Sequence, residues 1–202
     1  MRLGVDLGGT KIEAVILDER GDVFWRQRIP TPQRDYNATL KAVVQLVEEG
    51  KRFAGISSPT AIGIGTPGAE NKQGRMKNCN STALNGQSLR TDLSSLLKCH
   101  VSIANDANCF ALAEALGGQG QKSLSCHPNE YPIGDVPNVV FGVILGTGVG
   151  GGVVVGGKLL NGPNAITGEW GHNVMPLQVR PLKGEASEQR QCYCGRGVLV
   201  SC

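Results

Sequence analysis

The chain contains 202 residues, of which 40% are hydrophobic and 18% charged, proportions typical of a globular protein with a sizeable core. Its net charge is only +3 and its basic residues are scattered, which argues against nucleic acid as a partner. No stretch reaches the ~20 apolar residues that a membrane span requires, and the start lacks the apolar core of a signal peptide. The seven cysteines are odd in number and irregularly spaced, so we expect a cytoplasmic protein without a disulfide framework.

Strands and helices are predicted to alternate along the chain, which indicates an α/β fold. Short apolar runs bounded by turn residues predict strands over residues 2–6, 12–17, 23–28, 61–65, 101–104, 139–145 and 153–155. Apolar residues at helical spacing predict helices over residues 35–49, around 89–97 and over 106–116. Gly50 is placed as the C-terminal stop of the first helix.

A polar, aperiodic stretch over residues 117–137 interrupts this pattern. We interpret it as a loop at a domain boundary. The predicted organisation is therefore an N-terminal α/β domain over residues 1–116 and the start of a second α/β domain over residues 117–202.

The first glycine turn follows the first strand and runs from Asp6 to Lys11. Gly8 and Gly9 allow backbone N–H groups to approach a phosphate closely. Thr10 adds a hydroxyl donor and Lys11 a positive charge, while Asp6 is placed to orient Mg²⁺ or its water shell. A plain β-hairpin turn is the alternative, and the spacing fits neither a Walker loop nor a dinucleotide-binding turn.

A second glycine turn is predicted at residues 146–152, five of which are glycine. So many glycines carry a large entropic cost unless the backbone must be approached closely. We interpret the two turns as a clamp on a polyphosphate, although a glycine-rich bend without a ligand is the alternative. The candidate contacts here are Gly146, Thr147, Gly148, Gly150 and Gly151.

Asp106 follows a predicted strand and opens a predicted helix. A carboxylate in this place can accept a hydroxyl proton during phosphoryl transfer. Capping of the helix is the alternative role. A weaker signal lies nearer the end of the chain, where His172, Cys192 and Cys194 can supply three ligands of a tetrahedral Zn²⁺ site. Reduced thiols and a hydrogen-bonded histidine are the alternative there.

Taken in order, these motifs resemble the ROK family of sugar kinases and repressors. The resemblance rests on Asp6 to Lys11, Gly146 to Gly152, Gly168 to His172 and Cys192 to Gly195, and it covers essentially the whole chain. Residues 77–86, Lys-Asn-Cys-Asn-Ser-Thr-Ala-Leu-Asn-Gly, and Tyr193 after the first predicted zinc cysteine are most similar to bacterial fructokinases of the mannokinase type. N-acetylglucosamine kinases are close relatives, and residues 145–152 resemble theirs as much.

The resemblance implies an actin/hexokinase-like (ribonuclease H-like) fold of two domains, with ATP and a hexose between them. It implies that Asp106 is the base that deprotonates the 6-hydroxyl of the hexose, fructose in the first place, for attack on the γ-phosphate. The matching sugar-site positions are Gly68, Asn80, Asn105, Glu169 and His172. His172, Cys192 and Cys194 match zinc ligands that shape the sugar site. A homodimer is what the resemblance suggests.

The end of the chain departs from the family pattern. The family places a third cysteine five residues after the second, where this chain has Leu199, and Val198 replaces a glycine. Cys202 comes three residues later and the chain stops there. We interpret this as a truncated or frame-disrupted reading frame that lacks the C-terminal part of the fold. A sugar-sensing regulator is disfavoured, because the first strand leaves no room for a helix-turn-helix before it. An impaired sugar-binding fragment and an N-acetylglucosamine kinase are the alternatives to a fructokinase.

Overall fold

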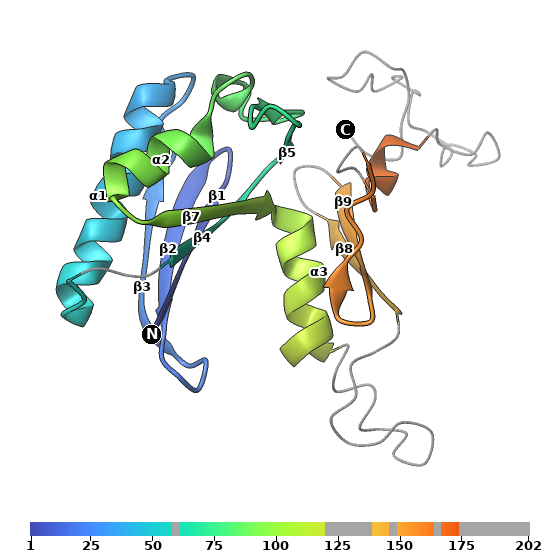
Figure 1. Ribbon diagram of the computed structural model, residues 1–202, viewed down its shortest axis with the longest axis horizontal. Coiled ribbons are helices and arrows are strands. Elements are labelled where there is room, and N and C mark those ends of the chain that lie inside the picture. The colour runs from blue at the N-terminus through green and yellow to red at the C-terminus, as the bar shows by residue number, and fades with distance from the viewer. Residues whose placement is uncertain (58–60, 120–138, 146–148, 164–166, 174–202) are drawn as a thin grey trace, which may run out of the picture. The chain divides into compact units, whose positions relative to one another are not determined.

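The computed structural model describes residues 1–57, 61–119, 139–145, 149–163 and 167–173 (Figure 1). Two compact units divide the chain, Met1–Asp106 and Ala107–Cys202. The sequence placed the boundary ten residues later, after residue 116, because the helix that begins at Asp106 was assigned to the first domain. None of the helices in the described ranges has the length and apolar character that a membrane crossing needs.

The first unit is built on a five-stranded mixed sheet in the order β3-β2-β1-β4-β7. Its strands are β1 (Arg2–Leu7), β2 (Lys11–Leu17), β3 (Val23–Pro30), β4 (Ala61–Thr66) and β7 (His100–Asn105). The first three form an antiparallel meander, and β1, β4 and β7 run parallel. The carboxyl ends of these three strands therefore meet at one edge of the sheet, where α/β proteins usually bind ligands.

Two helices, α1 (Tyr36–Ala54) and α2 (Leu89–Leu97), pack on this sheet and on each other (Figure 1). The Asp35 carboxylate caps α1 by accepting a hydrogen bond from the N–H of Ala38 at 2.9 Å. The apolar face of α1 predicted from the sequence is buried between helix and sheet, at Leu40, Val43 and Val47. Together with the inward residues of the strands it forms the core of the first unit.

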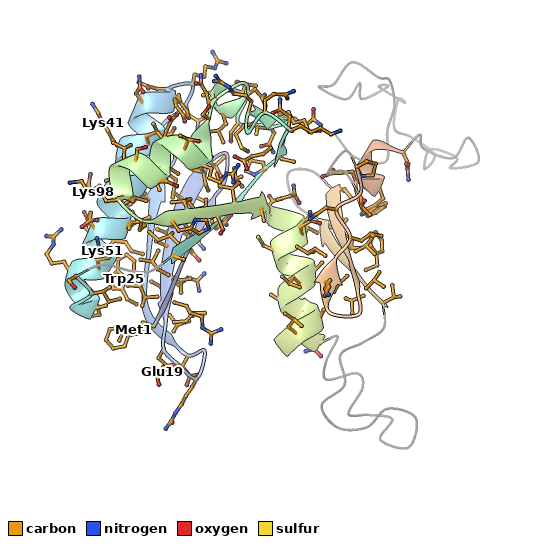
Figure 2. All side chains as sticks on the ribbon, viewed as in Figure 1. Met1, Glu19, Trp25, Lys41, Lys51 and Lys98 are labelled. Atoms are coloured by element: carbon orange, nitrogen blue, oxygen red, sulfur yellow. The ribbon has the colours of Figure 1, made fainter. Side chains whose placement is uncertain are left out.

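The predicted end of α1 was wrong. The helix continues five residues beyond Glu49, to Ala54, and ends at Gly55, which has the left-handed φ of 65°. Gly50 lies inside the helix and is buried. A Cβ at this position would lie 2.6 Å from the ring of Trp25 on β3. Trp25 is labelled in Figure 2. Gly50 is therefore required for close packing of helix on strand, and not as a helix stop.

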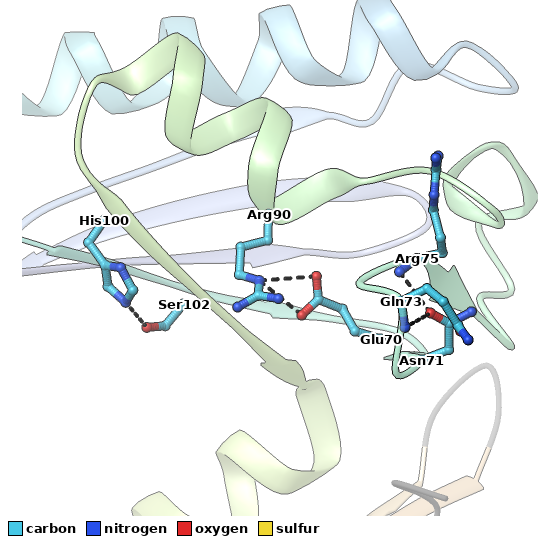
Figure 3. A network of polar contacts seen from close by, with 7 residues as sticks. All are labelled: Glu70, Asn71, Gln73, Arg75, Arg90, His100 and Ser102. Atoms are coloured by element: carbon cyan, nitrogen blue, oxygen red, sulfur yellow. Dashed lines mark hydrogen bonds and ion pairs between the residues drawn. The ribbon is translucent and has the colours of Figure 1, made fainter.

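A short hairpin, β5 (Ala69–Glu70) and β6 (Met76–Lys77), follows β4 and was not predicted. Its turn is closed by the Asn71 side chain, whose oxygen accepts from the N–H groups of Gln73 and Arg75 at 2.9 and 3.0 Å (Figure 3). Arg90 of α2 forms an ion pair with Glu70 at 3.1 Å. This hairpin leads directly into residues 78–81, which carry one of the predicted sugar-site positions.

The second unit contains α3 (Asp106–Gly117) and a three-stranded sheet in the order β10-β9-β8. Its strands are β8 (Val139–Leu145), β9 (Val149–Val155) and β10 (Lys158–Leu159), followed by a short 3₁₀ helix, η2 (Trp170–His172). Ala111, Ala115 and Val154 form its buried core among the described residues.

The part of the second glycine segment that the structure describes, residues 149–152, is strand. Sequence reasoning began the strand at residue 153, but β9 begins at Val149, so that Gly150, Gly151 and Gly152 all pair with β8. A Cβ on Gly152 would lie 2.9 Å from that of Ala111 in α3. Close approach of the helix therefore explains part of this glycine richness without a ligand.

Candidate active site

The first glycine turn joins β1 to β2 and has an unusual distribution of hydrogen bonds. Its carbonyl oxygens are bound from residues 31 and 33: Thr31 donates to Gly8 through its hydroxyl at 2.8 Å and to Thr10 through its N–H at 3.0 Å. Gln33 donates its side-chain N–H to Gly9 at 2.8 Å. In the described part of the chain, nothing accepts a hydrogen bond from the N–H of Gly9 or Thr10. The turn therefore has backbone donors available for an anion.

A second segment, which contains Asn80 and Ser81, packs against this turn at Gly9. A Cβ at Gly9 would lie 3.2 Å from the hydroxyl of Ser81 and 3.9 Å from the side-chain oxygen of Asn80. The structure thus places Asn80, a predicted sugar contact, next to Gly9, a predicted phosphate contact. Ser81 Oγ is buried and, of the described residues, none hydrogen-bonds to it. Sequence reasoning did not identify Ser81, because a serine in a loop carries no signal of its own.

Residues 78–85 are held in place by Asn85. Its side-chain oxygen accepts from the N–H of Cys79 at 2.9 Å, and its side-chain N–H donates to the carbonyl of Cys79 at 3.0 Å. The two bonds fix the backbone next to Asn80. Asn85 was included in the fructokinase-like segment, but its supporting role could not be read from the sequence.

Gly68 and Asn105, two further predicted sugar-site residues, contact each other directly. The Asn105 side-chain N–H donates to the Gly68 carbonyl at 3.2 Å. Gly68 has a φ of 80°, and a Cβ there would lie 2.3 Å from the carbonyl oxygen of Lys77 and 2.7 Å from the sulfur of Cys79. Only glycine fits this position, so the ends of β4 and β7 and the segment after β6 converge here.

Two carboxylates lie at this edge of the sheet, where β1 and β7 end. Asp6 is at the end of β1, and Asp106 directly follows β7 as the first residue of α3. Partial burial raises the pKa of Asp6, and the negative charges of Asp106 and Glu13 raise it further, against the opposing effect of Lys11 and Arg28. Asp106 therefore lies close enough to Asp6 to disfavour its charge, as two acids around one cation or reacting group would.

The second unit holds the other candidates, and not all of them fall in the described ranges. Gly150 and Gly151 lie on β9, and Glu169 immediately precedes η2. Gly146, Thr147, Gly148, Cys192 and Cys194 lie outside the described residues, and for His172 only the backbone is described. Within the described residues no group of three metal-binding side chains occurs.

The segment around Glu169 nevertheless contacts the glycine strand. The indole N–H of Trp170 donates to the carbonyl of Gly150 at 3.0 Å. A Cβ on Gly151 would lie 2.8 Å from the carbonyl oxygen of Gly168. Two motifs separated by about twenty residues of sequence, Gly150–Gly151 and Gly168–Trp170, are thus adjacent in this unit.

Sheet order and strand directions assign the chain to the actin/hexokinase-like fold class. The sequence pattern of the ROK family matches residues 2–198, and the chain belongs to that family. It is 41% identical over 197 residues to an N-acetyl-D-glucosamine kinase of Salmonella newport and 41% identical over 201 residues to one of Yersinia enterocolitica. The alignments cover 97% and 99% of this chain but only 60% and 61% of those kinases.

Solved structures agree with this assignment. A ROK hexokinase from Thermus thermophilus is similar with a TM-score of 0.69 and 29% identity, over 98% of this chain and 58% of that one. A ROK-family glucokinase from Streptomyces griseus, solved with glucose and AMPPNP, has a TM-score of 0.73 and 26% identity, over 98% of this chain and 55% of that one. The chain thus spans somewhat more than half the length of the relatives it matches.

Proposed function

We propose that this protein is an ATP-dependent sugar kinase that phosphorylates a hexose at its 6-hydroxyl, giving hexose 6-phosphate and ADP. One observation carries the proposal: at the end of β1 the first glycine turn has backbone N–H groups that no described residue accepts from, and Asn80 and Ser81 lie against this turn at Gly9. A pair of carboxylates beside free backbone N–H donors suits phosphoryl transfer, which depends on positioning and on charge stabilisation.

Asp106 is proposed as the general base. In the reaction the 6-hydroxyl oxygen would form a bond to the γ-phosphorus as the bond from that phosphorus to the β–γ bridging oxygen breaks. The hydroxyl proton would pass to the Asp106 carboxylate, and ADP would leave. Asn105 and Gly68, joined by their hydrogen bond, would orient the hexose beside this carboxylate.

Mg²⁺ fits the residues present: partial burial, and then the charges of Asp106 and Glu13, raise the pKa of Asp6, and a divalent cation would stabilise its ionised form. Asp6 would hold the ion directly or through water, and the ion would neutralise charge on the phosphate oxygens. Zn²⁺ at His172, Cys192 and Cys194 stays a prediction, since two of these residues lie outside the described ranges. Metal analysis of the purified protein would test it.

Two hexoses are candidates. The residues at 77–86 resemble fructokinases, but the curated relatives reported above are named N-acetyl-D-glucosamine kinases, and no comparison supports fructose. N-acetylglucosamine is therefore the first sugar to test and fructose the second, with mannose and glucose as further substrates.

The test is sugar-dependent ADP release by the purified chain with ATP and Mg²⁺, measured with each of the four sugars. Turnover that falls by about 10³-fold or more in Asp106→Asn would support the proposal. Asp22→Asn is the matched control, because Asp22 lies in the turn at the opposite end of β2 from the phosphate turn. Binding of sugar without ADP release would favour a sugar-binding protein, and equal turnover in Asp106→Asn would refute the role of this carboxylate.

A further inference from the structure

Trp170 joins two parts of the second unit through a single side-chain hydrogen bond. Its indole N–H donates to the Gly150 carbonyl at 3.0 Å, and the side chain is half-buried. The indole N–H usually finds a partner when Trp is buried, but here the partner is the main chain of a predicted phosphate-binding strand.

The backbone around Trp170 is bent so that Glu169 lies at the centre of a tight turn. Glu169 has φ of −73° and ψ of 57°, and the Trp170 N–H donates to the Gly168 carbonyl at 2.7 Å. These values define an inverse γ-turn. The Asn173 N–H donates in turn to the Trp170 carbonyl at 3.0 Å, which closes η2.

This turn is seated against β9 on its other side as well. Gly168 has a φ of 91°, and a Cβ there would lie 2.5 Å from the carbonyl oxygen of Gly151. The residues before and after Glu169 are therefore both in contact with the glycine strand, Gly168 by backbone packing and Trp170 by its indole. Glu169 cannot shift appreciably unless Gly150 and Gly151 shift with it or the Trp170 bond breaks.

From this geometry we infer that Trp170 is a positioning residue that couples hexose binding at Glu169 to phosphate binding at Gly150. The inference rests on the proposed function, and on the sequence-based predictions that Glu169 contacts the hexose and that Gly150 and Gly151 contact the nucleotide phosphates. A hexose that fixes the γ-turn would hold the strand through the indole bond, so the second ligand would encounter a site that is already ordered. The two ligands would then bind with positive, reciprocal coupling.

The test compares wild-type chain with Trp170→Phe, which keeps an aromatic ring and removes the N–H donor. The dissociation constant of a non-hydrolysable ATP analogue is measured with and without saturating hexose, N-acetylglucosamine or fructose, by isothermal titration calorimetry. The ratio of the two constants is the coupling factor. Loss of one ordinary hydrogen bond should lower it roughly fivefold in Trp170→Phe, with the affinity for hexose alone nearly unchanged.

Trp25→Phe serves as the matched control, because Trp25 is the other of the two tryptophans and packs on Gly50 in the first unit. It should leave the coupling factor unchanged. In this variant Trp170 gives the only indole signal, so NMR can also follow its N–H, which should exchange slowly with solvent in the free protein. That measurement does not depend on either ligand.

The outcomes separate this inference from the proposed function. A lower coupling factor in Trp170→Phe together with a protected indole N–H supports the inference. An unchanged coupling factor, with both ligands still binding, overturns the inference and leaves the kinase proposal intact. A rapidly exchanging indole N–H overturns it too. A wild-type chain that binds neither ligand contradicts the proposed function, and the inference falls with it.

Discussion

Asp6 occupies an environment that opposes its charge, although the residue itself is exposed at the surface. Partial burial of the carboxyl, then Asp106 and Glu13, raise its pKa above the ordinary value of 3.8. The folded protein therefore binds this proton more tightly than the unfolded chain does. The free energy of unfolding therefore falls as the pH rises from 3.8, the pKa of Asp6 in the unfolded chain, through its higher pKa in the folded protein. Above the folded-state pKa the decrease is complete. An ionised Asp6 thus lowers stability at neutral pH.

Asp6→Asn is accordingly predicted to stabilise the fold while it impairs binding of the nucleotide. The melting temperature at pH 7 should rise by a small amount, about 2 °C, because the carboxyl is partly exposed and solvent screens much of the repulsion. Near pH 3 the gain should disappear. Differential scanning calorimetry at the two pH values checks this, and a lower melting temperature at pH 7 would contradict it.

Ser81 is a second residue whose environment in the fold is unfavourable for its polar group. Its buried hydroxyl has no hydrogen-bond partner in the described residues, which is costly for a polar group. Ser81→Ala should therefore leave the free energy of unfolding unchanged or raise it by up to about 1 kcal/mol.

The same change should weaken binding of ATP or hexose roughly fivefold if the hydroxyl bonds to a ligand. Ser102→Ala is a suitable control, since Ser102 is exposed and its hydroxyl lies 3.2 Å from Nε2 of His100 (Figure 3). Urea unfolding and calorimetric titration separate the two effects. A Ser81→Ala protein that is clearly destabilised would indicate that the hydroxyl already has a structural role.

At the scale of elements, the contact of α1 with β3 shows how tertiary packing overrides helix propensity. Gly→Ala inside a helix ordinarily stabilises by about 1 kcal/mol. At Gly50, however, the added methyl group would lie 2.6 Å from one ring atom of Trp25 and 2.9 Å from another. The helix or the ring would have to move, and overpacking of this kind usually costs more than the propensity gains.

Gly50→Ala is predicted to destabilise the protein by about 2 kcal/mol. In a Trp25→Leu background, which removes the large ring, the same substitution should cost less than about 0.5 kcal/mol or stabilise. Urea denaturation of the four proteins of this double-mutant cycle measures the coupling. Equal effects of Gly50→Ala in both backgrounds would show that Trp25 is not the obstacle.

Regular elements with clear periodicity were predictable from the sequence. The strands of the meander, the strands β4 and β7, and α2 were found within one or two residues, because alternation or helical spacing marks them. The end of α1 was missed because the reason for Gly50 lies on another strand. The β5–β6 hairpin was missed because two-residue strands have no periodicity, and its turn depends on side-chain bonds from Asn71.

For the candidate site, the sequence located groups that the structure does bring together in the first unit: Asp6, Gly9, Asn80, Asn105 and Asp106. It could not locate Thr31, Gln33, Ser81 or Asn85, because these residues act on main-chain atoms that only the fold places beside them. Their catalytic relevance stays a prediction until the variants above are measured.

At the scale of the whole molecule, the two units differ in how much core they have in the described residues. The first buries aliphatic side chains from five strands and two helices, whereas the second buries Ala111, Ala115 and Val154. Hydrophobic burial is the main source of stability, so the units need not unfold together.

We predict that the second unit unfolds at a lower urea concentration than the first. Each unit contains one tryptophan, Trp25 or Trp170, so fluorescence of Trp170→Phe reports on the first unit and that of Trp25→Phe on the second. The Trp170 transition should have its midpoint roughly 1 M lower in urea. Coincident transitions from the two variants would show one cooperative unit instead.

The thiol of Cys79 beneath the Gly68 turn gives this chain an internal reporter. Burial, and then the charge of Asp106, raises the pKa of Cys79 to about 12, so that almost none of it is thiolate at neutral pH. Alkylating reagents can modify this sulfur only when residues 77–80 separate transiently from Gly68. The rate at which iodoacetamide labels the Cys79 peptide therefore measures how often that region opens, and a bound hexose should slow it.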